Sequence, residues 1–232
     1  MYNVSTTTSR EQYIDQGLKN FMISVYNNMC FALLISGLVA FGIAASPEAA
    51  SLIWKTHLKW IALLSPLVLS IGLLFFVDKL SSSSLRLFLY LFAGVMGVSI
   101  SIFFIVFKLG SVFQAFFITA AMFGTMTLYG YTTNRDLSGF GSFLMMGLIG
   151  VIIAGLVNLF LQSSMLAFIV SCVSVLVFTG LTAYETQQIK DSYNITDEEE
   201  RAKIGVLGAL NLYMNFINIF INLLQLIGEK NE

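Results

Sequence analysis

Seven apolar segments, each close to twenty residues long, constrain the fold of this chain more than any other feature. A helix needs about 20 apolar residues to cross the hydrocarbon core of a bilayer. Backbone polar groups in lipid must be hydrogen-bonded within their own segment, which favours helices. The sequence therefore predicts an all-α integral membrane protein with seven spans. The segments are 21–45, 58–77, 85–107, 113–131, 141–161, 165–186 and 206–227.

The composition agrees with this prediction and excludes several functional classes. Of the 232 residues, 57% are hydrophobic and 11% are charged, whereas about 25% of a soluble domain is charged. A net charge of −1 excludes the basic surface that nucleic-acid binding requires. Cys30, Cys172 and the single histidine, His57, are too few and too dispersed for a zinc site. Because no nucleophile elbow, phosphate loop or HExxH motif is present, we expect neither an enzyme nor a resident cofactor.

The connections between the apolar segments are short, so no linker marks a second domain. We interpret residues 1–20 as a polar cytosolic N-terminal tail without regular structure, since they lack the apolar core of a signal peptide. Residues 21–228 form a single seven-helix transmembrane domain in this interpretation, and 229–232 form a short C-terminal tail.

The distribution of Lys and Arg favours a cytoplasmic N-terminus. Cytoplasmic segments carry an excess of these residues, and this orientation places eight of the twelve inside. The count assumes that segment 206–227 crosses completely; a re-entrant segment would return the C-terminus to the inside. The inner residues are Arg10, Lys19, Lys79, Arg86, Arg135, Lys190, Arg201 and Lys203, and the outer ones are Lys55, Lys59, Lys108 and Lys230.

Small residues recur at a spacing of four in three of the segments. Such rows let helix backbones approach closely in lipid, so they predict a tightly packed bundle. The rows are Ala93, Gly97 and Ser101; Ala120 and Gly124; and Gly150 and Ala154.

The last segment carries a row of amide side chains, here called the amide seam. Its five members are spaced 4, 3, 4 and 3, so they share one helix face about 21 Å long. Unpaired amides are costly in hydrocarbon, which predicts that other helices surround this one. The seam has two interpretations: hydrogen bonds between helices, or a polar path for an ion or proton. Its members are Asn211, Asn215, Asn218, Asn222 and Gln225.

Glu185 follows a long apolar run and shares a helix face with Thr182 and Gln188. An ionisable side chain within a span marks a functional site by default. Inside the bundle, desolvation disfavours a charged carboxylate, which makes Glu185 a candidate for a change of protonation near physiological pH. Alternatively, Glu185 lies near enough to the helix end to reach the lipid headgroups beside Lys190.

Three blocks in order resemble bacterial members of the Bax inhibitor-1 family, the transmembrane BAX inhibitor motif proteins. They are SVFQAFFITAAMFGTMTLYGYTTNRDLSGFGSFLMMGLIGVIIAGLVNLF, FTGLTAYETQQIK and GALNLYMNFINIFINLLQLIG. The resemblance implies a seven-helix bundle with six helices around a central C-terminal helix. It also implies a calcium leak whose gate responds to protons. In the family, two aspartates on the last two helices sense protons, and a basic residue near the second helix latches onto them.

This chain departs from that pattern at the sensor. The two matching positions hold Glu185 and Asn215, one carboxylate and one carboxamide. Like-charge coupling is therefore lost, and we expect Glu185 to accept a hydrogen bond from the Asn215 amide and to titrate alone. Lys79 and Arg86 are the two bases that could act as the latch.

The sequence thus predicts a bacterial inner-membrane channel or leak protein for calcium ions, modulated by protons. Glu185 would be its gate or a binding group for Ca²⁺, and Asn211, Asn215, Asn218 and Asn222 would line the path. The alternative is a non-transporting regulatory protein, embedded in the same bilayer, that binds a membrane-bound quality-control protease through residues 1–20.

Overall fold

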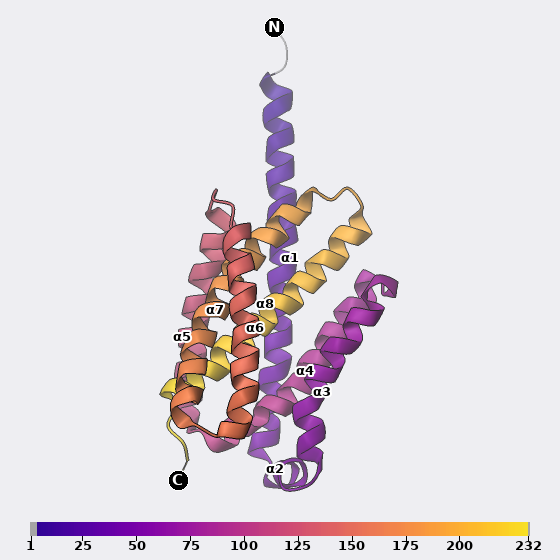
Figure 1. Cartoon of the computed structure of the whole chain (residues 1–232). Coiled ribbons are helices and arrows are strands. Elements are labelled where there is room, and N and C mark those ends of the chain that lie inside the picture. Colours follow the sequence, from indigo (N-terminus) through magenta and orange to yellow (C-terminus); the bar gives the residue numbers. More distant parts are fainter. Residues whose placement is uncertain (1–3, 232) are drawn as a thin grey trace.

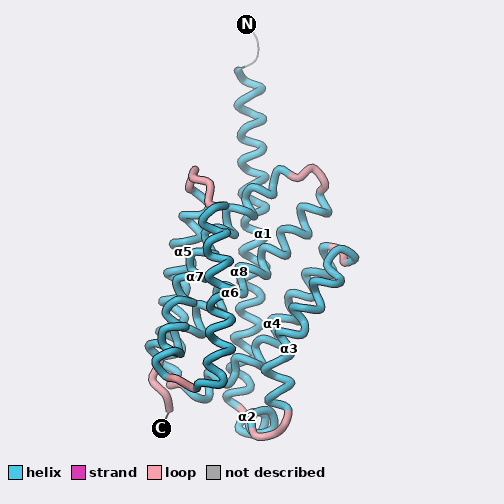
Figure 2. The backbone as a smooth tube through the Cα atoms, viewed as in Figure 1, coloured by secondary structure: helices cyan, strands magenta, loops and turns pink. Residues whose placement is uncertain are grey.

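The computed structural model describes the backbone of residues 4–231 and the side chains of residues 16–231 (Figure 1). Over these residues the chain is helical, with short turns that lie at the two ends of the molecule (Figure 2). The helices are α1 Val4–Ala45, α2 Pro47–Trp54, α3 Leu58–Phe76, α4 Ser82–Val106, α5 Leu109–Thr132, α6 Ser138–Leu161, α7 Ser164–Asp191 and α8 Glu198–Ile227, with 3-10 turns η1 Val77–Lys79 and η2 Ser192–Asn194.

The seven predicted spans are confirmed, since each corresponds to a segment of the structure that is long and apolar enough to cross a membrane. Capping residues extend some helices beyond their apolar segments. At the start of α8, Asp197 accepts a 2.8 Å hydrogen bond from the backbone N–H of Glu200, which satisfies one of the free donors of the first turn. The short helix α2 falls in a segment that we expected to be a simple connection. Ser46 caps it and Pro47 occupies its first turn.

Helix α1 begins at Val4, so its backbone is helical through most of the segment interpreted as a tail without regular structure. In Figure 1 this end of α1 extends beyond the other helices. The described backbone therefore corrects the expected conformation of residues 4–20.

Helix α8 packs against α1, α4, α5 and α7 and is the most buried of the seven spans. Helix α3 packs on α4, and α6 packs on α7. The arrangement of six helices around a central α8, which the family resemblance implied, stays a prediction.

One of the three rows of small residues forms the predicted close approach. A side chain at Gly97 would meet the carbonyl oxygen of Ser36 and the side chain of Val39, both at 2.8 Å. The Ser36 hydroxyl donates to the carbonyl of Ala93 at 2.8 Å, so α1 and α4 are in backbone contact. The prediction is wrong for the other two rows, because Gly124 and Gly150 have no described atom within 4 Å of an added side chain.

Helix α8 is continuous for 30 residues, and the two termini lie at opposite ends of the molecule (Figure 1). The last residues pair with the α4–α5 turn in what we call the C-terminal clamp, formed by residues 106–108 and 229–231. Lys108 N donates to Glu229 O, and Asn231 N donates to Val106 O, each at 2.8 Å. The seventh segment therefore contains no re-entrant turn.

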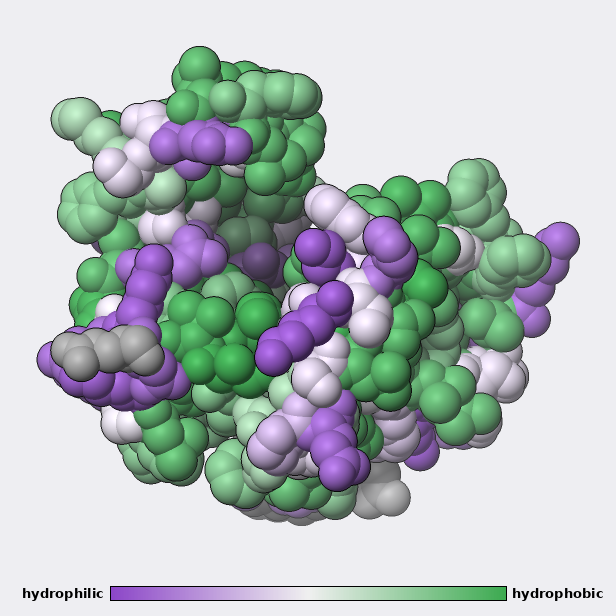
Figure 3. All heavy atoms as spheres, turned by 90° about the horizontal axis from the view of Figure 1, so that it is seen from below, coloured by the Kyte–Doolittle hydropathy of each residue, from purple (hydrophilic) through white to green (hydrophobic). Residues whose placement is uncertain are grey.

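The outer surfaces of α3 and α6 are apolar. Leu74 and Phe75 on α3 and Phe160 on α6 are all exposed by more than 70%. Seen from the C-terminal end, hydrophobic side chains cover most of the rim of the molecule (Figure 3). Such a surface is typical of helices that face lipid.

Candidate functional site

Glu185 and Asn215 meet at the contact between α7 and α8. The Asn215 amide nitrogen Nδ2 donates a 2.6 Å hydrogen bond to the carboxyl oxygen Oε2 of Glu185. Asn215 is only 4% exposed, and Glu185 is partly buried. This is the hydrogen bond that we expected from the sequence. Helices α7 and α8, which follow one another in the chain, are thus joined by a polar contact that includes an ionisable group.

Glu185 lies six residues before the end of α7 at Asp191, so the alternative in which it reaches the headgroups beside Lys190 stays a prediction. The Lys190 Nζ donates to the carbonyl of Tyr131 at 2.9 Å and lies 5.7 Å from the centre of the Tyr131 ring. Lys190 therefore ties α7 to the end of α5.

The polar patch expected around Glu185 is wrong in its composition. Thr182 is buried, and its hydroxyl donates to the Phe178 carbonyl of its own helix. Gln188 is exposed. Of the three residues, Glu185 alone makes a side-chain hydrogen bond to another helix among the described residues.

The amide seam contacts α7 near both its ends. Besides the bond between Asn215 and Glu185, Gln225 accepts a 3.2 Å hydrogen bond from the hydroxyl of Ser171. Asn218 and Asn222 donate at 2.8 Å to backbone carbonyls one turn earlier in α8, and Asn211 is exposed. Hydrogen bonds between helices thus account for two members of the seam. A polar path along the seam stays a prediction.

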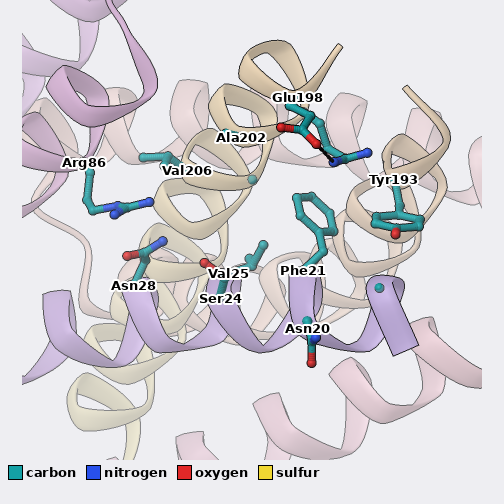
Figure 4. Close-up of a pocket in the computed structure, with 13 residues that line it drawn as sticks. Asn20, Phe21, Ser24, Val25, Asn28, Arg86, Tyr193, Glu198, Ala202 and Val206 are labelled. Atoms are coloured by element: carbon teal, nitrogen blue, oxygen red, sulfur yellow. Dashed lines mark ion pairs between the residues drawn. The ribbon is translucent and has the colours of Figure 1, made fainter. Parts of the chain in front are cut away.

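The two predicted latch bases do not contact Glu185. Within the described residues, neither Lys79 nor Arg86 forms an ion pair with a carboxylate. Lys79 ends the turn η1, and Arg86 lies near the start of α4, where it lines a pocket with Ser24 and Asn28 (Figure 4).

Gln187, which the sequence pattern did not single out, is 6% exposed. Its Oε1 accepts from the backbone N–H of Leu137 at 2.9 Å, and its Nε2 donates to the carbonyl of Arg135 at 2.8 Å. One buried side chain thus fixes the turn between α5 and α6. Gln187 shares a helix face with the small residues Gly180 and Ala183. A small-residue face marks the side of a span that packs against other helices, so this spacing could have identified Gln187 as buried.

The Glu185–Asn215 pair offers oxygen ligands of the type that Ca²⁺ prefers. A calcium ion takes about six to eight oxygens, and the pair can provide a carboxylate and one amide oxygen. The part of the chain that the structure describes contains no group of three or more His, Cys, Asp or Glu side chains able to hold a metal. A calcium site at this pair stays a prediction.

Comparisons with known proteins place the whole chain in one family. The family described as "Inhibitor of apoptosis-promoting Bax1" matches residues 18–232. The Inner membrane protein YbhL of Escherichia coli is 40% identical over 218 residues, covering 92% of this chain and 93% of YbhL. A protein of Rickettsia prowazekii is 39% identical over 230 residues, covering 98% of this chain and 97% of the relative. A protein of Caulobacter vibrioides is 37% identical over 231 residues, covering 94% and 92%. The chain is a membrane protein of the Bax inhibitor-1 family.

Proposed function

We propose that the protein is an ion channel or leak protein of the bacterial inner membrane, permeable to calcium and modulated by pH. The observation that carries the proposal is the carboxyl group of Glu185, held between two spans by the 2.6 Å hydrogen bond from Asn215. Ionisable groups inside membrane bundles mark ion pathways and proton relays. The relative YbhL is named an inner membrane protein, which supports the location.

The geometry suggests how a proton would act on this contact. An ionised carboxylate accepts a charge-assisted hydrogen bond from the amide, and such bonds are about twice as strong as neutral ones. Protonation of Glu185 removes that charge, weakens the contact between α7 and α8, and removes a binding group for a divalent cation. Because Asn215 does not titrate, the response follows a single-site curve without the coupling of two carboxylates.

Flux measurements in liposomes that contain a calcium dye test this function. We expect calcium flux through the wild-type protein to change from about pH 5 to pH 8, and flux through Glu185→Gln to be independent of pH. Gln188→Ala, which changes an exposed residue on the same helix, is the matched control and should behave as wild type. If the wild-type protein shows no calcium flux at any pH in this range, the proposal is wrong.

A second function is favoured by the N-terminal part of α1. Its backbone is helical from Val4 and extends beyond the other helices in Figure 1, which leaves space for another membrane protein beside it. In this alternative the protein regulates a membrane-bound quality-control protease from a cytoplasmic N-terminus and transports nothing. Deletion of residues 2–18 would then abolish co-purification of a protease. Retention of the same co-purifying proteins after the deletion would exclude the alternative.

A further inference from the structure

A pocket of about 470 Å³ opens at the end of the bundle where α1 enters. Helices α1, α4 and α8 and the turn η2 surround it (Figure 4). Phe21, Val25 and Val206 supply apolar walls. The pocket is separate from the Glu185–Asn215 contact, whose residues do not line it.

One side of the pocket presents hydrogen-bond donors. Asn28 is 8% exposed, and its Oδ1 accepts a 2.9 Å hydrogen bond from the hydroxyl of Tyr90. This bond orients the amide so that Nδ2 points toward the guanidinium of Arg86 (Figure 4). A guanidinium and an amide NH₂ are both donors, so together they favour a group that accepts hydrogen bonds and carries negative charge.

The guanidinium of Arg86 is free to bind such a group. In the described part of the chain, Arg86 takes part in no ion pair. The hydroxyl of Ser24 lies beside Asn28 on the pocket wall (Figure 4). This side of the pocket thus carries an uncompensated positive charge.

Among the described residues that line the pocket, one acidic side chain is present, and it lies on the other side with a basic partner. Glu198 Oε1 is 3.9 Å from Arg201 Nη2, and the Arg201 guanidinium lies 5.1 Å from the centre of the Tyr193 ring. The described lining of the pocket thus contains two guanidinium groups, of Arg86 and Arg201, and one carboxylate, of Glu198. Its net charge is positive.

The position of the pocket connects this charge with the bilayer. Its residues belong to the first halves of the spans Gln16–Ala45, Ser82–Val106 and Glu198–Ile227 and to the end of the span Ser164–Asn194. The ends of spans lie at the level of the lipid headgroups, and basic pockets between spans bind anionic headgroups. Arg is well suited to phosphate because its planar fork makes two parallel hydrogen bonds.

We propose that this pocket binds the phosphate group of an anionic phospholipid, with Arg86 and Asn28 as the main donors and the apolar walls against the glycerol end of the acyl chains. A free phosphate compound offers the same chemistry to the two donors. The experiment therefore contains one arm for each source.

Native mass spectrometry of the full-length protein tests the lipid arm, with equal amounts of phosphatidylglycerol and phosphatidylcholine in the detergent. We expect preferential retention of phosphatidylglycerol, and at least about fivefold weaker retention in Arg86→Gln, the effect of one basic group at a membrane surface. Asn28→Asp should weaken it as well, because the new carboxylate repels phosphate while still accepting the hydrogen bond from Tyr90.

Matched controls separate the pocket from general charge effects. Asn27→Asp makes the same change at an exposed neighbouring position, and Arg135→Gln removes an exposed arginine of the α5–α6 turn. Both should retain phosphatidylglycerol as the wild type does. Size-exclusion chromatography and circular dichroism verify that each variant is folded.

The second arm is a titration of the same proteins with inorganic phosphate and glycerol phosphate by isothermal calorimetry. Binding that depends on Arg86 and Asn28 without a preference for phosphatidylglycerol supports a soluble phosphate as the ligand. Preference for phosphatidylglycerol that depends on these residues supports the lipid. The proposal is overturned if the wild type retains both lipids equally and binds no free phosphate. It is also overturned if the variants and their controls lose binding equally.

Discussion

The amide of Asn215 donates a 2.6 Å hydrogen bond to the carboxyl group of Glu185, which joins α7 and α8 through a single ionisable side chain. The family resemblance associates these two positions with a pair of carboxylates. This chain carries one carboxylate at these two positions, and four predictions test what this and other contacts do.

Replacing Asn215 by Asp should make stability depend on pH. Two carboxyl groups at hydrogen-bond distance cannot both ionise readily, so the variant needs a shared proton. At pH 8 we expect Asn215→Asp to be about 1–3 kcal/mol less stable than wild type, the usual cost of losing a buried hydrogen bond, with recovery toward pH 5. Unfolding in mixed micelles measures this. Asn211→Asp introduces the same charge at an exposed position of the seam, and an equal pH dependence there would contradict the prediction.

Gly130 and Gly124, both on α5, should respond in opposite ways to replacement by Ala. A side chain at Gly130 would overlap the backbone carbonyl of Ala183 on α7, whereas none of the described atoms lies within 4 Å at Gly124. We expect Gly130→Ala to destabilise by about 1–3 kcal/mol. Gly124→Ala should be neutral or stabilise by up to about 1 kcal/mol, because Ala has the higher helix propensity. The two unfolding midpoints provide the comparison, and equal midpoints would show that α5 and α7 are not in backbone contact.

Gln187→Leu should loosen the turn between α5 and α6. The substitution leaves the carbonyl of Arg135 and the N–H of Leu137 without their side-chain partner, which costs about 1–3 kcal/mol for a buried group. Hydrogen exchange should accelerate at Leu137. Gln188→Leu changes the exposed neighbour and leaves both bonds in place, so unchanged exchange in this control and faster exchange in Gln187→Leu are expected together.

The ion pair of the C-terminal clamp should disappear at acidic pH. Lys108 Nζ lies 2.8 Å from Glu229 Oε2, and this hydrogen bond and the charge of Lys108 lower the pKa of the Glu229 carboxyl below its ordinary value. A lowered pKa means that the contact is present above the ordinary glutamate range and is lost as pH falls through the pKa of the folded protein. Carbon NMR of labelled Glu229 measures that midpoint.

Lys108→Met should return the Glu229 midpoint to the ordinary range near 4.3. Lys230→Met removes an adjacent lysine that makes no ion pair among the described side chains and should leave the midpoint low. Because both partners are exposed, high salt should also raise the midpoint by screening.

The number and approximate positions of the spans could be predicted from the sequence because lipid imposes one requirement on every span: a run of apolar residues in a helix. The pairing of Glu185 with Asn215 followed from the resemblance together with the chemistry of an amide beside a carboxylate. In both cases, the spans and the residue pair, few arrangements of the chain are compatible with the residues present.

Which side of each helix meets a neighbour could not be predicted in the same way. Rotation and tilt of a span depend on packing against other helices, and a sequence that is apolar on all sides does not define them. Gln187 and Gln188, which are neighbours on α7, illustrate this. The Gln187 side chain is buried against the α5–α6 turn, whereas that of Gln188 is exposed. The same ambiguity explains why Gly97 lies at a helix contact and Gly124 does not.

The C-terminal clamp has a mechanical consequence for α8. Since backbone hydrogen bonds hold residues 229–231 to the α4–α5 turn, a tilt of α8 leaves this end in place, and the displacement grows along the helix. A helix of 30 residues is about 45 Å long, so a tilt of about 5° moves its first turn by about 4 Å. The clamp is thus the pivot for a tilt of α8, and Glu198, at the opposite end of the helix, is displaced farthest.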